Sequence, residues 1–118
     1  MWESETGLTQ VWLNGKPSSR KTLFKGGSLT GPLVVVLGQD QDAYGGRFSS
    51  NDALIGQLTA VHMWDRVISP CEVQQFTENK LVNGGNMINW EALDYSTYGD
   101  VIEEKQIDGT GQQDCALA

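Results

Sequence analysis

The sequence predicts an all-β fold, an antiparallel sandwich or jelly roll with one short helix. Several short runs of strand-forming residues are separated by glycine, proline and asparagine turn signals, as in all-β domains. Fourteen glycines among 118 residues favour many tight turns, and only one stretch carries a clear helix-start signature. The length allows one small domain.

The N-terminal third predicts a hairpin followed by a buried strand. Residues 8–13 are rich in strand formers, Asn14-Gly15 is a strong hairpin signal, and residues 21–24 can serve as the returning strand. Residues 33–37 (Leu-Val-Val-Val-Leu) form a continuous apolar run. Such a run predicts a buried strand covered on both faces.

The middle of the chain predicts one more strand and the helix. In the apolar segment 53–64 some residues are spaced as in a helix, but Gly56 and the β-branched content favour a strand. Ser69 can cap a helix, Pro70 fits its first position, and Glu72 completes a capping box. This helix is expected to be the only one and to stop by residues 83–85 (Asn-Gly-Gly). Residues 87–90 and 101–102 are predicted to be short strands, and 108–118 a polar tail.

Charge and motifs exclude several classes of protein. The formal net charge is −7, and the longest basic stretch, residues 16–25, holds four positive charges, so no nucleic-acid specificity is expected. No transmembrane segment is expected, since no run of 18 apolar residues occurs, and no signal peptide is visible. No catalytic activity is expected, because the single histidine, His62, lies in an apolar segment and no nucleophile motif is present. Cys71 and Cys115 can form a disulfide bond or remain separate thiols.

The acidic loop at residues 37–48, LGQDQDAYGGRF, is the candidate for chemistry. Calcium binds six to eight oxygens from carboxylates, amides and carbonyls. Asp40, Gln41 and Asp42 supply such oxygens, and Asp52 can return to the same point. An EF-hand is excluded, since position 12 of its loop would be Asn51 where a glutamate is expected. From the residues alone, a calcium loop and a solvated acidic turn both remain open.

Several segments resemble the pentraxin family in order and spacing. They are WESETG, VWLNGKPSSRKTL, LGQDQDAYGGRF, IGQLTAVHMWDRVISP and NMINWEAL, and the match covers residues 2–102. The resemblance implies a flattened antiparallel jelly roll, similar to legume lectins and laminin G domains, with one helix across a face. It also implies a secreted protein of innate immunity that binds two adjacent calcium ions. Through the open positions of those ions, pentraxins hold phosphate- or carboxylate-bearing ligands.

The resemblance assigns the loop residues individually. Asp40 stands where the family usually has glutamate, Gln41 would contribute its carbonyl, and Asp42 matches an aspartate ligand. Asp52 stands where a glutamine contacts the second ion, and Ser49 where a further carboxylate is usual. We therefore expect the first calcium site to be retained more readily than the second.

The resemblance covers only the C-terminal half of a pentraxin domain. It implies residues 1–107 as this half domain and 108–118 as a tail. A half jelly roll exposes strand edges, which invite pairing with other chains. A homo-oligomer or a partner chain that completes the domain is expected. The ligands would be anionic small molecules, polysaccharides or phospholipid headgroups; the alternative is a structural or interaction fragment without calcium-dependent binding.

Overall fold

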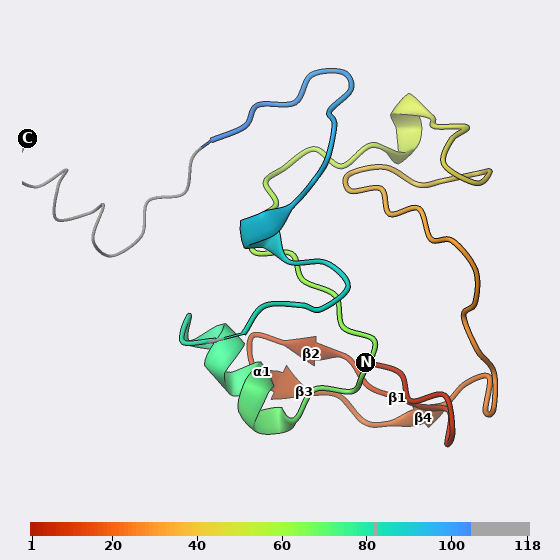
Figure 1. The fold of residues 1–118 in the computed structure, drawn as a ribbon, viewed down its shortest axis with the longest axis vertical. Coiled ribbons are helices and arrows are strands. Elements are labelled where there is room, and N and C mark those ends of the chain that lie inside the picture. Colours follow the sequence, from red (N-terminus) through yellow and green to blue (C-terminus); the bar gives the residue numbers. More distant parts are fainter. Residues whose placement is uncertain (82, 105–118) are drawn as a thin grey trace, which may run out of the picture.

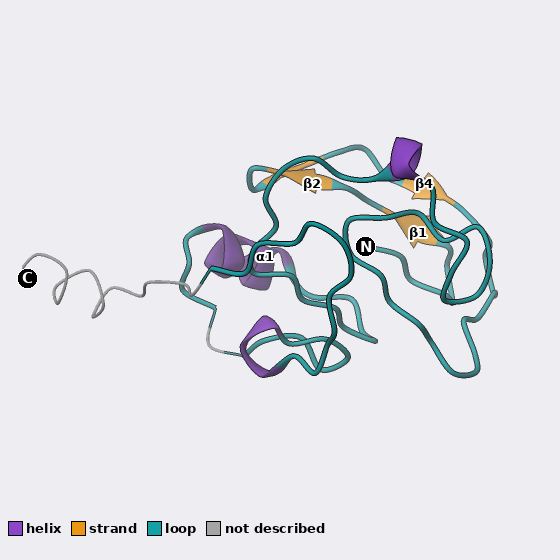
Figure 2. Ribbon diagram, turned by 90° about the horizontal axis from the view of Figure 1, so that it is seen from above, coloured by secondary structure: helices purple, strands orange, loops and turns teal. Residues whose placement is uncertain are grey.

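The computed structural model describes residues 1–81 and 83–104. Its strands are β1 (Leu8–Thr9), β2 (Trp12–Leu13), β3 (Lys16–Pro17) and β4 (Lys21–Thr22), and its one α-helix in this part is α1 (Pro70–Thr77). Two 3-10 turns, η1 (Ser50–Asp52) and η2 (Trp90–Ala92), complete the regular structure (Figure 1). The regular elements are thus short strands and one short helix, as predicted, but most of the ribbon is loop (Figure 2).

The four strands belong to one long hairpin. Trp12 pairs with Pro17 at its tip, and Leu8 pairs with Thr22 at its base. Asn14 (φ 53°) and Gly15 (φ 79°) both have the positive φ of a type I′ turn, so the predicted hairpin is confirmed. The returning strand starts at Lys16, earlier than predicted.

A bulge separates the two halves of this hairpin. Leu8 and Trp12 are four residues apart, whereas their partners Thr22 and Pro17 are five residues apart. The returning strand therefore carries one extra residue. The Ser18 N–H donates to the Val11 carbonyl at 2.8 Å, and the Ser18 hydroxyl accepts from the Val11 N–H at 3.1 Å. These bonds bridge the gap between β2–β3 and β1–β4.

The sequence specifies both ends of α1. The Ser69 Oγ accepts from the Glu72 N–H, and the Glu72 carboxylate accepts from the Ser69 N–H, each at 3.1 Å, which confirms the predicted capping box. At the C-terminus Asn79 is left-handed (φ 58°), and the Lys80 N–H reaches the Gln75 carbonyl at 2.7 Å. This Schellman-type ending stops the helix at Thr77, before the glycines at 84 and 85.

The predicted later strands are wrong in the described structure. Residues 33–37 and 53–62 form no strand, and of the late segments only Ile88 makes a bridge, to Met63. Residues 33–35 and 37 are 40–50% exposed rather than buried. A run of strand formers becomes a strand only where a partner segment accepts its hydrogen bonds, and the described residues offer none here.

The buried part of the chain is small. Among the described residues the buried apolar side chains are Ile68 and Val73, just before α1 and within it. A Cβ on Gly15 would lie 3.2 Å from the Thr77 methyl group, so the hairpin tip touches the end of α1. Figure 1 shows α1 beside the hairpin, with residues 28–60 extending away from it.

The Ser69 cap can be tested by substitution. We expect Ser69→Ala to lower the free energy of unfolding by about 1 kcal/mol, because it leaves the Glu72 N–H without its acceptor. Urea unfolding followed by circular dichroism measures the change. Ser69→Asp retains a capping oxygen and should stay close to wild type; equal losses in both variants would contradict a capping role.

The ion pair at the start of α1 predicts a dependence on acid. Arg66 donates to Glu72 through both guanidinium nitrogens, at 3.0 and 2.7 Å, and with the Ser69 N–H it lowers the Glu72 pKa to about 2. An unfolded glutamate has a pKa of about 4.3. The stabilisation is therefore fully present above about pH 4.3 and is lost as the pH falls towards 2.

Thermal unfolding between pH 2 and 5 would measure this loss. Glu72→Gln keeps a capping amide but cannot titrate. Its melting temperature should fall less steeply with acid than that of wild type. Parallel curves for the two proteins would exclude Glu72 as the group responsible.

Candidate functional site

Hydrogen bonds tie the two arms of the acidic loop together. The Gln39 amide donates to the Ser49 carbonyl at 2.7 Å and accepts from the Asp40 N–H at 3.0 Å. The Leu54 N–H donates to the Gly38 carbonyl at 2.8 Å. The chain therefore leaves at Gly38 and returns at Leu54, as needed for residues on both arms to act together.

Gln41 holds the inner turn of this loop. Its Nε2 donates to the Val34 carbonyl at 3.1 Å, and its Oε1 accepts from the Gly45 N–H at 2.8 Å. A carbonyl oxygen has two lone pairs, so one remains for a cation. The side chain predicted to be a calcium ligand therefore also shapes the loop.

The structure brings two of the four predicted ligands to one hollow. Asp40 and Asp52 both line an open hollow of about 630 Å³, whose wall is otherwise largely apolar and includes Leu37, Leu54 and Leu58. Gln41 and Asp42 are outside its lining. Within residues 1–81 and 83–104, no three histidine, cysteine or acidic side chains form a group that could hold a metal ion.

The loop carboxylates differ from Glu72 and Glu78 in their partners. Glu72 is bound to Arg66. Glu78 accepts a hydrogen bond from the Gln74 amide and lies 3.2 Å from the Lys80 ammonium, and these two partners lower the Glu78 pKa. By contrast, no hydrogen bond or ion pair within the described chain engages the side chains of Asp40, Asp42 and Asp52. Their oxygens are therefore available to a cation.

The donor chemistry of the loop fits calcium. Asp40, Asp42, Asp52 and Gln41 offer only oxygen atoms, the ligands that Ca²⁺ prefers. Two carboxylates on a hollow and a third on the neighbouring turn supply part of a coordination shell of six to eight oxygens. Water or another segment would have to supply the rest.

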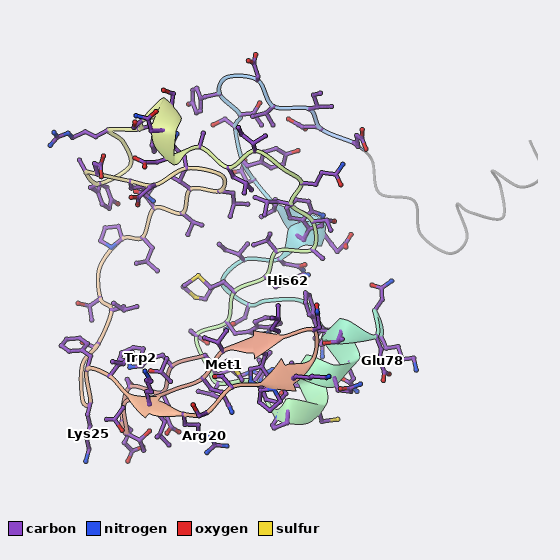
Figure 3. All side chains as sticks on the ribbon, turned by 180° about the vertical axis from the view of Figure 1, so that it is seen from behind. Met1, Trp2, Arg20, Lys25, His62 and Glu78 are labelled. Atoms are coloured by element: carbon purple, nitrogen blue, oxygen red, sulfur yellow. The ribbon has the colours of Figure 1, made fainter. Side chains whose placement is uncertain are left out.

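A second hollow lies beside His62 and the C-terminal end of α1, and the sequence did not predict it. Its volume is about 190 Å³, and its wall includes His62, Phe76, Asn79, Asn89 and Glu91. His62 was expected to be a packed or half-exposed strand residue. It is half-buried, its ring lies 5.8 Å from Trp64 and 6.1 Å from Phe76, and Figure 3 shows it near α1. One polar ring among apolar neighbours was the only signal in the sequence.

Two further expectations, the disulfide bond and the polar tail, involve residues outside the described chain. Cys71 is exposed at the start of α1, whereas Cys115 and the predicted tail 108–118 lie outside the described residues, so their pairing stays a prediction. None of the helices in the described ranges has the length and apolar character needed to span a bilayer.

Comparison with known proteins identifies the relatives of the chain. The model of the Pentaxin family matches residues 1–104. C-reactive protein of Rattus norvegicus is 42% identical over 106 residues, covering 90% of this chain and 46% of that protein. Serum amyloid P-component of Cavia porcellus is 40% identical over 106 residues (90% and 47%), and mucosal pentraxin of Mus musculus 40% over 101 (86% and 44%).

The three matches cover similar shares of this chain and of the relatives. The chain spans about half the length of the curated relatives it matches. The family match nevertheless covers all but the last residues, including the acidic loop and the capped helix. The chain belongs to the pentraxin family.

Proposed function

We propose that the chain is a calcium-dependent recognition module that captures anionic groups, such as phosphate-bearing ligands, through bound calcium. The observation that carries this proposal is the set of three loop carboxylates, Asp40, Asp42 and Asp52, which no described residue neutralises. Pentraxins generally bind calcium, which supports the assignment. Family membership also supports a secreted role in innate pattern recognition.

The chemistry explains how an acidic chain would bind anions. Asp40 and Asp52, which line the hollow, would hold the ion, and Asp42 and the free Gln41 lone pair would contribute from the inner turn. A Ca²⁺ ion that keeps some positions for water can exchange that water for a phosphate or carboxylate oxygen. Asp40 has a shorter side chain than the glutamate usual in the family, and Ser49 carries no charge. Both features weaken a second ion, so one site is proposed.

The role is recognition rather than catalysis. The only histidine accepts a hydrogen bond from the Gly85 N–H at its Nδ1 and packs against two aromatic rings. This places the imidazole in a structural contact and supports a binding module.

A structural or interaction role without calcium is the second candidate. The absence of a three-acid cluster in the described chain favours it. The exposed apolar side chains of residues 33–35 and 37, and of Ile55, which is 99% exposed, also suit a surface for another protein.

Calorimetric titration with Ca²⁺ distinguishes the two candidates. We expect wild type to bind calcium and Asp42→Ala to bind at least about tenfold more weakly, because a lost charged ligand costs about 1.4 kcal/mol or more. Asp94→Ala removes the same charge from an exposed position outside the loop and should bind as wild type does. Equal and very weak heats for wild type and Asp42→Ala would support the second candidate.

We also propose that a second chain, either another copy or one that completes the domain, covers the apolar segment 33–37. The segment has strand-forming residues, but its backbone pairs with no other strand in the described structure. Mass measurement in solution should therefore give a species heavier than the 12.9 kDa chain, and Val35→Asp should shift it towards that mass. A wild-type monomer, both with and without calcium, would contradict this assembly.

A further inference from the structure

The second hollow has the size of a single six-membered ring. Its volume of about 190 Å³ slightly exceeds the roughly 150 Å³ of a cavity that holds benzene. It lies between the C-terminal end of α1 and the segment that runs from Gly84 to Glu91. A Cβ on Gly84 would collide with the Asn89 side chain, so the glycine allows this segment to fold closely against Asn89.

The hydrogen bonds of His62 and Asn89 fix which of their atoms can serve a ligand. The Gly85 N–H donates to His62 Nδ1 at 3.1 Å, which assigns the ring proton to Nε2 and makes that nitrogen a donor. Asn89 Oδ1 accepts from the Glu91 N–H at 3.2 Å, and no described residue accepts from its Nδ2. Two residues of the wall of the hollow therefore carry a donor that no described residue uses.

The same wall also has acceptors and an apolar face. The Glu91 carboxylate and the Asn79 amide have no hydrogen-bond partner among the described side chains. Phe76 contributes a ring that meets His62 edge-on, at 87°. The hollow thus combines donors, acceptors and an apolar surface within the dimensions of one ring.

We propose that this hollow binds one ring of a neutral, polyhydroxylated molecule of monosaccharide size, without calcium. Each hydroxyl both donates and accepts, so it can satisfy His62 and Asn89 as well as Glu91, while the C–H face of the ring lies against Phe76. An anion would be repelled by Glu91. A cation would meet the N–H donors of His62 and Asn89.

The test is saturation-transfer NMR on the full chain in EDTA, with glucose, galactose and mannose as separate probes. We expect at least one sugar to bind in the millimolar range. Glu91→Ala should weaken that binding about tenfold, the effect of losing a hydrogen bond from a charged acceptor. Glu91→Gln, which retains a carbonyl acceptor, should weaken it less.

Two further variants separate binding from folding. Asn79 has a positive φ of 58°, so Asn79→Gly removes the amide without straining the end of α1 and should also reduce sugar binding. Asp42→Ala, which alters the proposed calcium loop, should leave sugar binding unchanged. The proposal is overturned if none of the three sugars gives a signal, if binding requires calcium, or if neither Glu91→Ala nor Asn79→Gly weakens it.

Discussion

The pairing of backbone N–H and C=O groups is the constraint on which the rest of this structure depends. Between residues 8 and 22 the chain satisfies these groups by folding back on itself, and the bulge at Ser18 keeps both halves of the hairpin paired. Residues 33–37 have equally strong strand-forming side chains but no ladder partner in the described part of the chain. The same local preference therefore gives a strand in one place and an exposed apolar segment in the other.

Whether an element depends on nearby residues or on a distant partner explains which predictions succeeded. The type I′ turn at Asn14-Gly15 and the capping box of Ser69 and Glu72 depend on residues within four positions of each other, and both are confirmed. The family membership confirms the jelly-roll class with its one short helix. The strands expected at 33–37 and 53–64 depend on distant partners, which a propensity argument cannot supply. The end of α1 was placed by the glycines at 84 and 85, whereas the left-handed Asn79 had already ended it.

The candidate site also combines features that nearby residues determine with features that depend on distant parts of the chain. The sequence allowed Asp52 to return towards the other loop residues, and Asp40 and Asp52 line one hollow. Their role as metal ligands stays a prediction. The double role of Gln41, with one lone pair used by the Gly45 N–H, could not be read from the sequence, because it depends on the path of the turn. The convergence of Asp42 with the other two carboxylates stays a prediction. The hollow beside His62 was missed because its wall combines residues from three separate segments, around positions 62, 76–79 and 84–91.

The two hollows differ in how they would achieve selectivity. Around Asp40 and Asp52 the carboxylates have no basic partner in the described chain, so the selectivity proposed there rests on charge. Around His62 the polar groups are mixed and partly used by the backbone, so selectivity rests on hydrogen-bond direction and ring size. The binding proposed at the first hollow would depend on charge, which salt screens, whereas the binding proposed at the second would depend on hydrogen bonds that salt affects little. The loop of each hollow is held by its own hydrogen bonds, so an ion at the first does not need the second to be filled.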